Sequence, residues 1–212
     1  MFTEKELIWI IIAIMISTFI IAFPLSSSTI ITLFLALIVS ALVILTNVFA
    51  KKLSSTYYNI KIEHTIWGMQ QFGFREMDKT KNQFPMGLIL PFFLAFLSNG
   101  IIKIFPILQF DAENLYTRRI LKQSGERNRR KTEINESDLA FTAAWGFAAL
   151  LLLALIGYFI NFKMLTIYSV LYGFWNLLPI SQLDGSKLFF GSFIAWVLIL
   201  IIYVASIIAI VF

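Results

Sequence analysis

The sequence contains no cysteine and only one histidine, His64. Without cysteine, disulfide bonds, thiol catalysis and cysteine-ligated metal are excluded. Charged residues are also scarce, at 14% of the 212 residues, whereas 59% are hydrophobic and the mean hydropathy is +0.83. A soluble domain of this size cannot bury that much apolar surface, so the composition predicts a polytopic membrane protein. The net charge is +5, but no segment is large enough to form a basic soluble domain, which excludes nucleic-acid binding.

Long apolar runs predict an all-α polytopic membrane fold. A spanning helix needs about 20 consecutive apolar residues, and four runs reach that length: residues 7–25, 30–50, 139–160 and 189–212. A shorter fifth run, residues 165–180, brings the expected number of spanning helices to about five. No internal repeat divides the chain, so residues 1–212 are expected to form a single domain.

A further apolar run, residues 86–108, is interrupted by Pro91, Gly100, Lys103 and Pro106. Such interruptions are tolerated in a bilayer only where neighbouring protein or water satisfies the backbone. We therefore expect a re-entrant or broken segment that enters the membrane and returns on the same side. A single kinked crossing is the alternative.

Lysine and arginine gather on both sides of this broken segment. The positive-inside rule places such segments in the cytoplasm. Residues 51–85 are therefore predicted to be cytoplasmic or interfacial, and residues 111–138 to form a charged cytoplasmic loop. The chain is then a multi-pass protein, expected in the cell membrane, with a cytoplasmic N-terminus.

Residues 59–77 alternate apolar and polar side chains, which is the pattern of a half-buried strand. Ile60, Ile62 and His64 fall on one face of such a strand, and Glu63 falls on the other. The alternation resumes farther along, at two phenylalanines. We expect a small β-hairpin at the membrane interface.

The most specific pattern is residues 176–185, the polar sequence NLLPISQLDG between two apolar runs. Asp184 is predicted to lie at or inside the membrane boundary, where an ionisable side chain is costly and marks a functional site by default. Asp-Gly is also a common turn pair, so a plain turn between two helices is the alternative. Asn176, Pro179 and the Leu-Asp-Gly triplet resemble the N-x-x-P-x-x-x-L-D-G signature of the site-2 protease family, which are intramembrane zinc metallopeptidases.

This resemblance implies a zinc site in which Asp184 is the third ligand, beside two histidines of an H-E-x-x-H motif on an earlier helix. One histidine cannot supply two ligands. Compact family members often continue that motif with a lysine, which Lys51 matches. In this register Thr46 and Ala50 replace the two ligands, and Asn47 replaces the general base although it cannot accept a proton at neutral pH. We therefore expect no cofactor, and only a vestigial metal position at Asp184.

The resemblance then implies a catalytically inactive pseudoprotease that binds transmembrane segments of other membrane proteins. Asn176 and Pro179 are the candidate substrate contacts, because proline frees a helical carbonyl and asparagine can hydrogen-bond a backbone beside it. The family's membrane-associated β-hairpin implies a second contact, in which a substrate adds as a strand. The expected partners are transmembrane segments, the lipid bilayer and an active relative that the protein assists.

Two other functional classes stay open. An active metallopeptidase with unusual ligands would combine Asp184 with His64 and Glu63 around zinc, although neighbouring residues of a strand point to opposite faces. Bound metal would identify it. A transporter would line a pathway with the broken segment and Asp184. Against this class, the other spans carry almost no ionisable residues, and a flux assay in liposomes would distinguish it.

Overall fold

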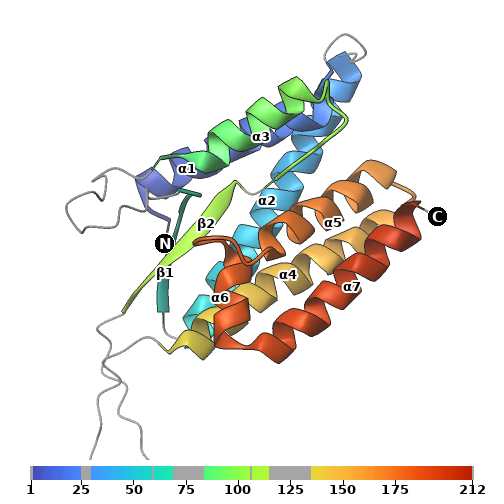
Figure 1. Ribbon diagram of the computed structural model, residues 1–212. Coiled ribbons are helices and arrows are strands. Elements are labelled where there is room, and N and C mark those ends of the chain that lie inside the picture. Colours follow the sequence, from blue (N-terminus) through green and yellow to red (C-terminus); the bar gives the residue numbers. More distant parts are fainter. Residues whose placement is uncertain are drawn as a thin grey trace, which may run out of the picture.

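The chain folds into a mostly helical protein with one small antiparallel sheet (Figure 1). The computed structural model describes residues 2–24, 30–58, 60–68, 84–105, 107–114 and 135–211. The elements in chain order are α1 (Glu4–Ala22), α2 (Ile30–Tyr58), β1 (Ile60–Ile66), α3 (Met86–Leu97), β2 (Leu108–Asn114), α4 (Glu136–Phe159), α5 (Lys163–Leu177), α6 (Asp184–Gly191) and α7 (Phe193–Val211). The predicted helical class with a small β element is confirmed.

Within the described part of the chain, four helices are long and apolar enough to cross a membrane: α1, α2, α4 and α7. They coincide with the four long apolar runs, but their ends differ. α2 continues beyond Ala50 to Tyr58, because no helix-breaking residue interrupts it. The C-terminal run is divided by the extended backbone of Ser192, so α7 begins at Phe193, and Phe189 belongs to α6.

The helices α3 and α5 are shorter than a membrane span. α3 has 12 residues and α5 has 15, which at 1.5 Å per residue correspond to roughly 18 Å and 22 Å. The hydrocarbon core of a bilayer is about 30 Å thick. Their lengths alone therefore do not establish the predicted fifth span or a crossing by residues 86–108.

The segment that contains α3 leaves the sheet and returns to it. At its start the Gly87 N–H donates to the Trp67 carbonyl (2.8 Å), and at its end the Trp67 N–H donates to the Ile107 carbonyl (2.8 Å). Between them, Gly100 lies at the far end of α1, where an added Cβ atom would stand 2.6 Å from the Phe23 carbonyl oxygen. Its φ of +80° also favours glycine. Both ends of this excursion thus meet at Trp67.

The small sheet joins β1 to β2, in an antiparallel register that pairs His64 with Phe110. The predicted face of β1 is buried, since Ile60, Ile62 and His64 are each at most 4% exposed. A hairpin within residues 59–77 is not the pairing found, because the return of the chain from α3 supplies the partner strand. Residues 69–83, which include the second half of that hairpin, lie outside the described ranges.

The predicted charged loop, residues 111–138, is shorter than expected. Its first residues, 111–114, belong to β2, and α4 begins at Glu136. The side chain of Asn135 caps α4 by accepting a hydrogen bond from the Ser137 N–H (3.4 Å). Residues 115–134 lie outside the described ranges.

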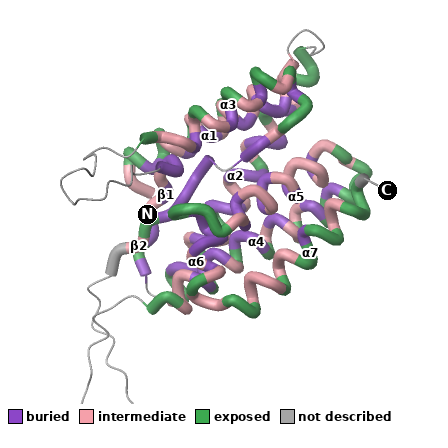
Figure 2. The backbone as a smooth tube through the Cα atoms, in the orientation of Figure 1, coloured by how far each residue is buried: buried purple, intermediate pink, exposed green. Residues whose placement is uncertain are grey.

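α2 is the central helix of the bundle. It packs against α1 on one side and against α4 and α5 on the other, and α7 covers α4 and α5 (Figure 1). Buried residues gather where α2, α4, α6 and the sheet meet, whereas α7 and the outer faces of α1 and α3 are largely exposed (Figure 2). Most of those exposed side chains are apolar, which is the arrangement that a lipid environment favours.

Candidate functional site

The motif of residues 176–185 folds back on itself and carries Asp184 into the interior. α5 ends at Leu177, the chain turns through Ser181 (φ +51°), and Asp184 is the first residue of α6. Gly185 packs so closely on the end of α5 that an added Cβ atom would overlap the Leu177 carbonyl group. The glycine of the Leu-Asp-Gly triplet therefore has a steric role, because it lets α6 begin directly against α5. Asp184 is 1% exposed.

The carboxylate of Asp184 is paired with the ammonium group of Lys51, which reaches it from α2. Both residues are almost fully buried, and the ammonium donates to Asp184 Oδ2. A buried charge without a partner is strongly destabilising. The pair therefore fixes the C-terminal part of α2 to the beginning of α6, although the two are far apart in the sequence.

Asn47 lies one helical turn before Lys51 on the same face of α2. Both side chains contact Gly146 of α4. A Cβ atom on Gly146 would stand 2.6 Å from Lys51 Cε and 3.0 Å from Asn47 Nδ2. Gly146 thus leaves the space that these side chains occupy between the two helices. Asn47 is 1% exposed, and its Nδ2 has no hydrogen-bond partner among the described residues.

A second lysine, Lys187 of α6, also lies beside the Phe110 ring that Lys51 approaches. Its ammonium donates to the Phe110 carbonyl and stands 3.7 Å from the ring centroid, whereas Lys51 Nζ is 5.7 Å from that centroid. Both distances fall within the range of cation–π attraction. Burial lowers the pKa of Lys187 to about 8, and the attraction of Asp184 and Asp111 opposes part of that shift.

These residues form one group at the sheet end of the bundle. We call it the Asp184 cluster, and its members are Asn47, Lys51, Phe110, Gly146, Asp184 and Lys187. It contains two ammonium groups and one carboxylate. The net charge of the cluster is therefore positive, unlike that of a set of metal-binding ligands.

A separate polar network holds the other edge of the sheet. Glu6 of α1 is 1% exposed; its Oε1 accepts from the His64 N–H (3.1 Å) and lies 2.7 Å from His64 Nδ1. Lys52 Nζ stands 2.9 Å from Glu6 Oε2 and donates to the Ile62 carbonyl (2.5 Å). Burial lowers the pKa of His64, although its hydrogen bond with Glu6 acts in the opposite direction. His64 thus joins β1 to α1 as part of a structural network.

The unusual ligand set considered for an active enzyme is not brought together. Glu63 points away from the buried face of β1, is 32% exposed and pairs with Lys61 at 3.0 Å. His64 is bound to Glu6. Over the described ranges, no three histidine, cysteine, aspartate or glutamate side chains gather closely enough to hold a metal ion.

The residues of α2 that face the Asp184 cluster lie one position beyond the expected register. Thr46 and Ala50, the predicted replacements for the two ligands, are half-buried, whereas Asn47 and Lys51 are buried against Gly146. An α-helix turns by about 100° per residue, so a shift of one residue changes which side chains face the cluster. Lys51 as the partner of Asp184 was not predicted, although an isolated buried carboxylate in an apolar chain calls for a cation.

Asn176 binds the backbone of its own chain. Its Nδ2 donates to the carbonyls of Phe105 (2.9 Å) and Tyr172 (2.8 Å), while its buried Oδ1 has no hydrogen-bond partner within the described ranges. The donors expected to contact a substrate are therefore already engaged, one by the segment that returns from α3 and one by the preceding turn of α5. Pro179 lies in the turn after α5 and is exposed.

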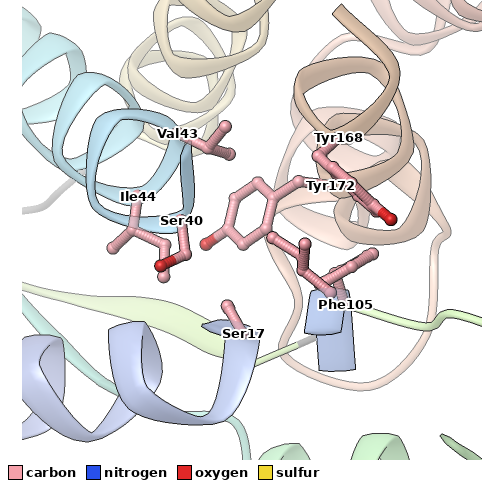
Figure 3. A pocket seen from close by; sticks show the side chains of 8 residues that line it. Ser17, Ser40, Val43, Ile44, Phe105, Tyr168 and Tyr172 are labelled. Atoms are coloured by element: carbon pink, nitrogen blue, oxygen red, sulfur yellow. The ribbon is translucent and has the colours of Figure 1, made fainter. Parts of the chain in front are cut away.

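A small cavity lies between α1, α2 and α5, beside Phe105 (Figure 3). Its volume is about 10 Å³, which suffices for about one water molecule. The Tyr172 hydroxyl points into it toward Ser40, and the Oγ atom of Ser17 on its wall has no hydrogen-bond partner among the described residues (Figure 3). A solute larger than water does not fit, so this cavity gives no support to a transport pathway.

Replacing Gly185 by alanine is expected to separate α6 from the end of α5, because the new methyl group overlaps the Leu177 carbonyl. Overpacking of this kind costs about 1–3 kcal/mol, and the thermal unfolding midpoint in detergent should fall. Ser186→Ala is the control, since the buried Ser186 Oγ has no hydrogen-bond partner in the described structure. Equal midpoints for the two variants would contradict the steric role of Gly185.

Replacing Lys51 by methionine should destabilise the protein by about 3–5 kcal/mol, because it leaves the Asp184 carboxylate buried without its main partner. In the double variant Lys51→Met/Asp184→Asn no such charge remains, so much of the stability should return. Chemical unfolding of both single variants and the double variant measures the coupling. Strictly additive effects would show that the two side chains do not interact.

The comparisons with known proteins add no relative. No family model matches the sequence, and no curated protein and no solved structure matches it. The resemblance to the site-2 protease family therefore depends on residues 176–185 and on the layout of the chain.

Proposed function

We propose that this chain is a site-2-protease-like membrane protein that lacks zinc chemistry and binds transmembrane segments. The observation that carries the proposal is the ion pair between Lys51 and Asp184. In the family, the aspartate of the L-D-G motif meets two histidines placed four residues apart on an earlier helix. Here the residues four apart on α2 that face the cluster are Asn47 and Lys51, and an ammonium group neutralises the aspartate.

This arrangement opposes zinc binding for electrostatic and chemical reasons. A catalytic zinc needs about three protein ligands and an open position for water. The Lys51 ammonium engages one oxygen of Asp184, and Lys187 adds a second positive charge nearby. The general base of the family's motif directly follows the first ligand. In α2 the residue after Thr46 is Asn47 and the residue after Asn47 is Val48, so neither the expected nor the observed register provides a carboxylate there. Such a protein acts by binding.

The edge of β2 supports a mode of binding. The His64 N–H points toward Glu6 and not toward β2. His64 and Phe110 are therefore a non-hydrogen-bonded pair, in which the N–H and C=O groups of both residues point away from the partner strand. Every second pair of an antiparallel ladder has this geometry. The Phe110 carbonyl therefore lies on the outer edge of β2, where Lys187 now occupies it. An extended substrate segment would add to this edge by displacing the Lys187 ammonium.

The layout of the chain supports the membrane topology that the proposal requires. The segment from Gly87 to Ile107 has both ends at Trp67, as a re-entrant segment does. Residues 51–85 and 111–138, which carry most of the cations, connect to the same end of the bundle. This end is then cytoplasmic, together with the N-terminus, and α5 is a short fifth span in a multi-pass protein of the cell membrane. An active relative remains a proposed partner.

Zinc analysis of the purified protein tests the loss of metal chemistry. Mass spectrometry of the elements should find no stoichiometric zinc in the native chain or in the Asp184→Ala variant, because Lys51 and Lys187 repel a cation. Stoichiometric zinc that disappears in the variant would refute the proposal and favour an active metallopeptidase.

Photocrosslinking tests the binding edge. A photoreactive amino acid at Ala112 of β2 should crosslink a single-span test protein that carries a helix-breaking stretch at its cytoplasmic boundary. Lys187→Met, which frees the Phe110 carbonyl, should raise the yield on the order of tenfold. Lys163→Met, the same change at the other end of the bundle, is the control. Equal yields in both variants would show that Lys187 does not occupy the binding edge.

A further inference from the structure

At the end of the bundle opposite the sheet, α4, α5 and α7 leave two adjoining cavities. Their volumes are about 300 Å³ and 210 Å³. Both are lined by Tyr158, Thr166, Ala209 and Ile210, so they adjoin each other and together extend from the ends of the helices toward the middle of the bundle. We call this space the α4–α7 groove. The helix ends that line its outer part lie near the C-terminus in Figure 1.

The inner part of the groove is apolar. Its walls are formed by Leu151 and Leu155 of α4, Val170 of α5 and Ile202 of α7. From Ile210 to Ile202 the groove follows α7 for about 12 Å, at 1.5 Å per residue. This part is thus an elongated apolar space suited to a hydrocarbon chain.

The outer part of the groove is polar and positively charged. Asn161 and Lys163 line its mouth, and Lys163 is exposed and forms no ion pair with any residue that the structure describes. Between the two parts, Thr166 Oγ1 is buried and has no hydrogen-bond partner in the described ranges. From inside to outside, the groove is therefore lined by apolar side chains, then by Thr166, whose Oγ1 lies against Gly157 of α4, and then by a cation.

We propose that the α4–α7 groove binds one phospholipid. Its acyl chain fills the inner part, its glycerol-ester region lies where the two cavities adjoin, and its phosphate pairs with Lys163. The depth agrees with this occupant, since Tyr158 and Lys163 are residues of the kinds that mark the membrane interface. A transmembrane helix of a partner fits less well, because a helix with its side chains is about 10–12 Å wide and the inner space is about 300 Å³.

This inference is independent of the proposed pseudoprotease function, because the groove shares no residue with the Asp184 cluster. The groove lies between α5 and α7, and the described part of α7 is otherwise little buried. A bound acyl chain would therefore also hold α7 against the bundle.

Native mass spectrometry of the delipidated full chain in detergent, titrated with phosphatidylglycerol, tests the proposal. We expect one tightly retained lipid per chain. Lys163→Glu should weaken its retention about fivefold or more, because it removes a cation from the phosphate. Lys5→Glu, the same charge change near the N-terminus, should leave retention unchanged. Diolein, which has the acyl chains without the phosphate, should bind more weakly than phosphatidylglycerol.

A second pair of variants tests the location. Ala209→Trp places a large ring where the two cavities join and should abolish retention. Ala205→Trp on the same helix does not line the groove and should retain the lipid. Equal retention by these two variants would overturn the proposal, as would a dimer of the native chain that Ala209→Trp disperses, because a second copy would then cover the groove. If Ala209→Trp does not fold, the comparison of Lys163→Glu with Lys5→Glu decides the outcome.

Discussion

The buried ion pair between Lys51 and Asp184 constrains the whole sheet end of the bundle. Neither charge is tolerable there alone, so α2 and α6 must lie where the ammonium and the carboxylate meet. Two glycines make that approach possible: Gly146 leaves space on α4 for the side chains of α2, and Gly185 lets α6 begin against the end of α5. Four helices therefore pack around this one ion pair.

Charged side chains also hold both outer edges of the sheet. On the edge of β1, Glu6 and Lys52 bind the backbone of His64 and Ile62. On the edge of β2, Lys187 binds the Phe110 carbonyl. A two-stranded sheet has two open edges, and unpaired edges invite association with other strands. Here each edge has a charged partner from a neighbouring helix, and an incoming strand would have to displace that partner.

The two ends of the bundle thus offer different chemistry. The sheet end concentrates fixed charges, which favour polar backbone ligands and oppose a metal cation. At the opposite end, the α4–α7 groove is mainly apolar, with Lys163 at its mouth. We propose a peptide-binding role for the first end and a lipid-binding role for the second. The two roles are physically separable, because they use different residues of different helices.

The sequence by itself determined the elements whose signal is local. Uninterrupted apolar runs define the four long helices, alternation defines the buried face of β1, and the count of one histidine excludes a pair of histidine ligands. Only the tertiary structure decided which elements meet. It paired β1 with β2 across the excursion through α3, and it turned Asn47 and Lys51 toward the cluster in place of Thr46 and Ala50. Strand pairing joins distant segments, and one residue rotates a helix face by about 100°, so neither could be read from local pattern.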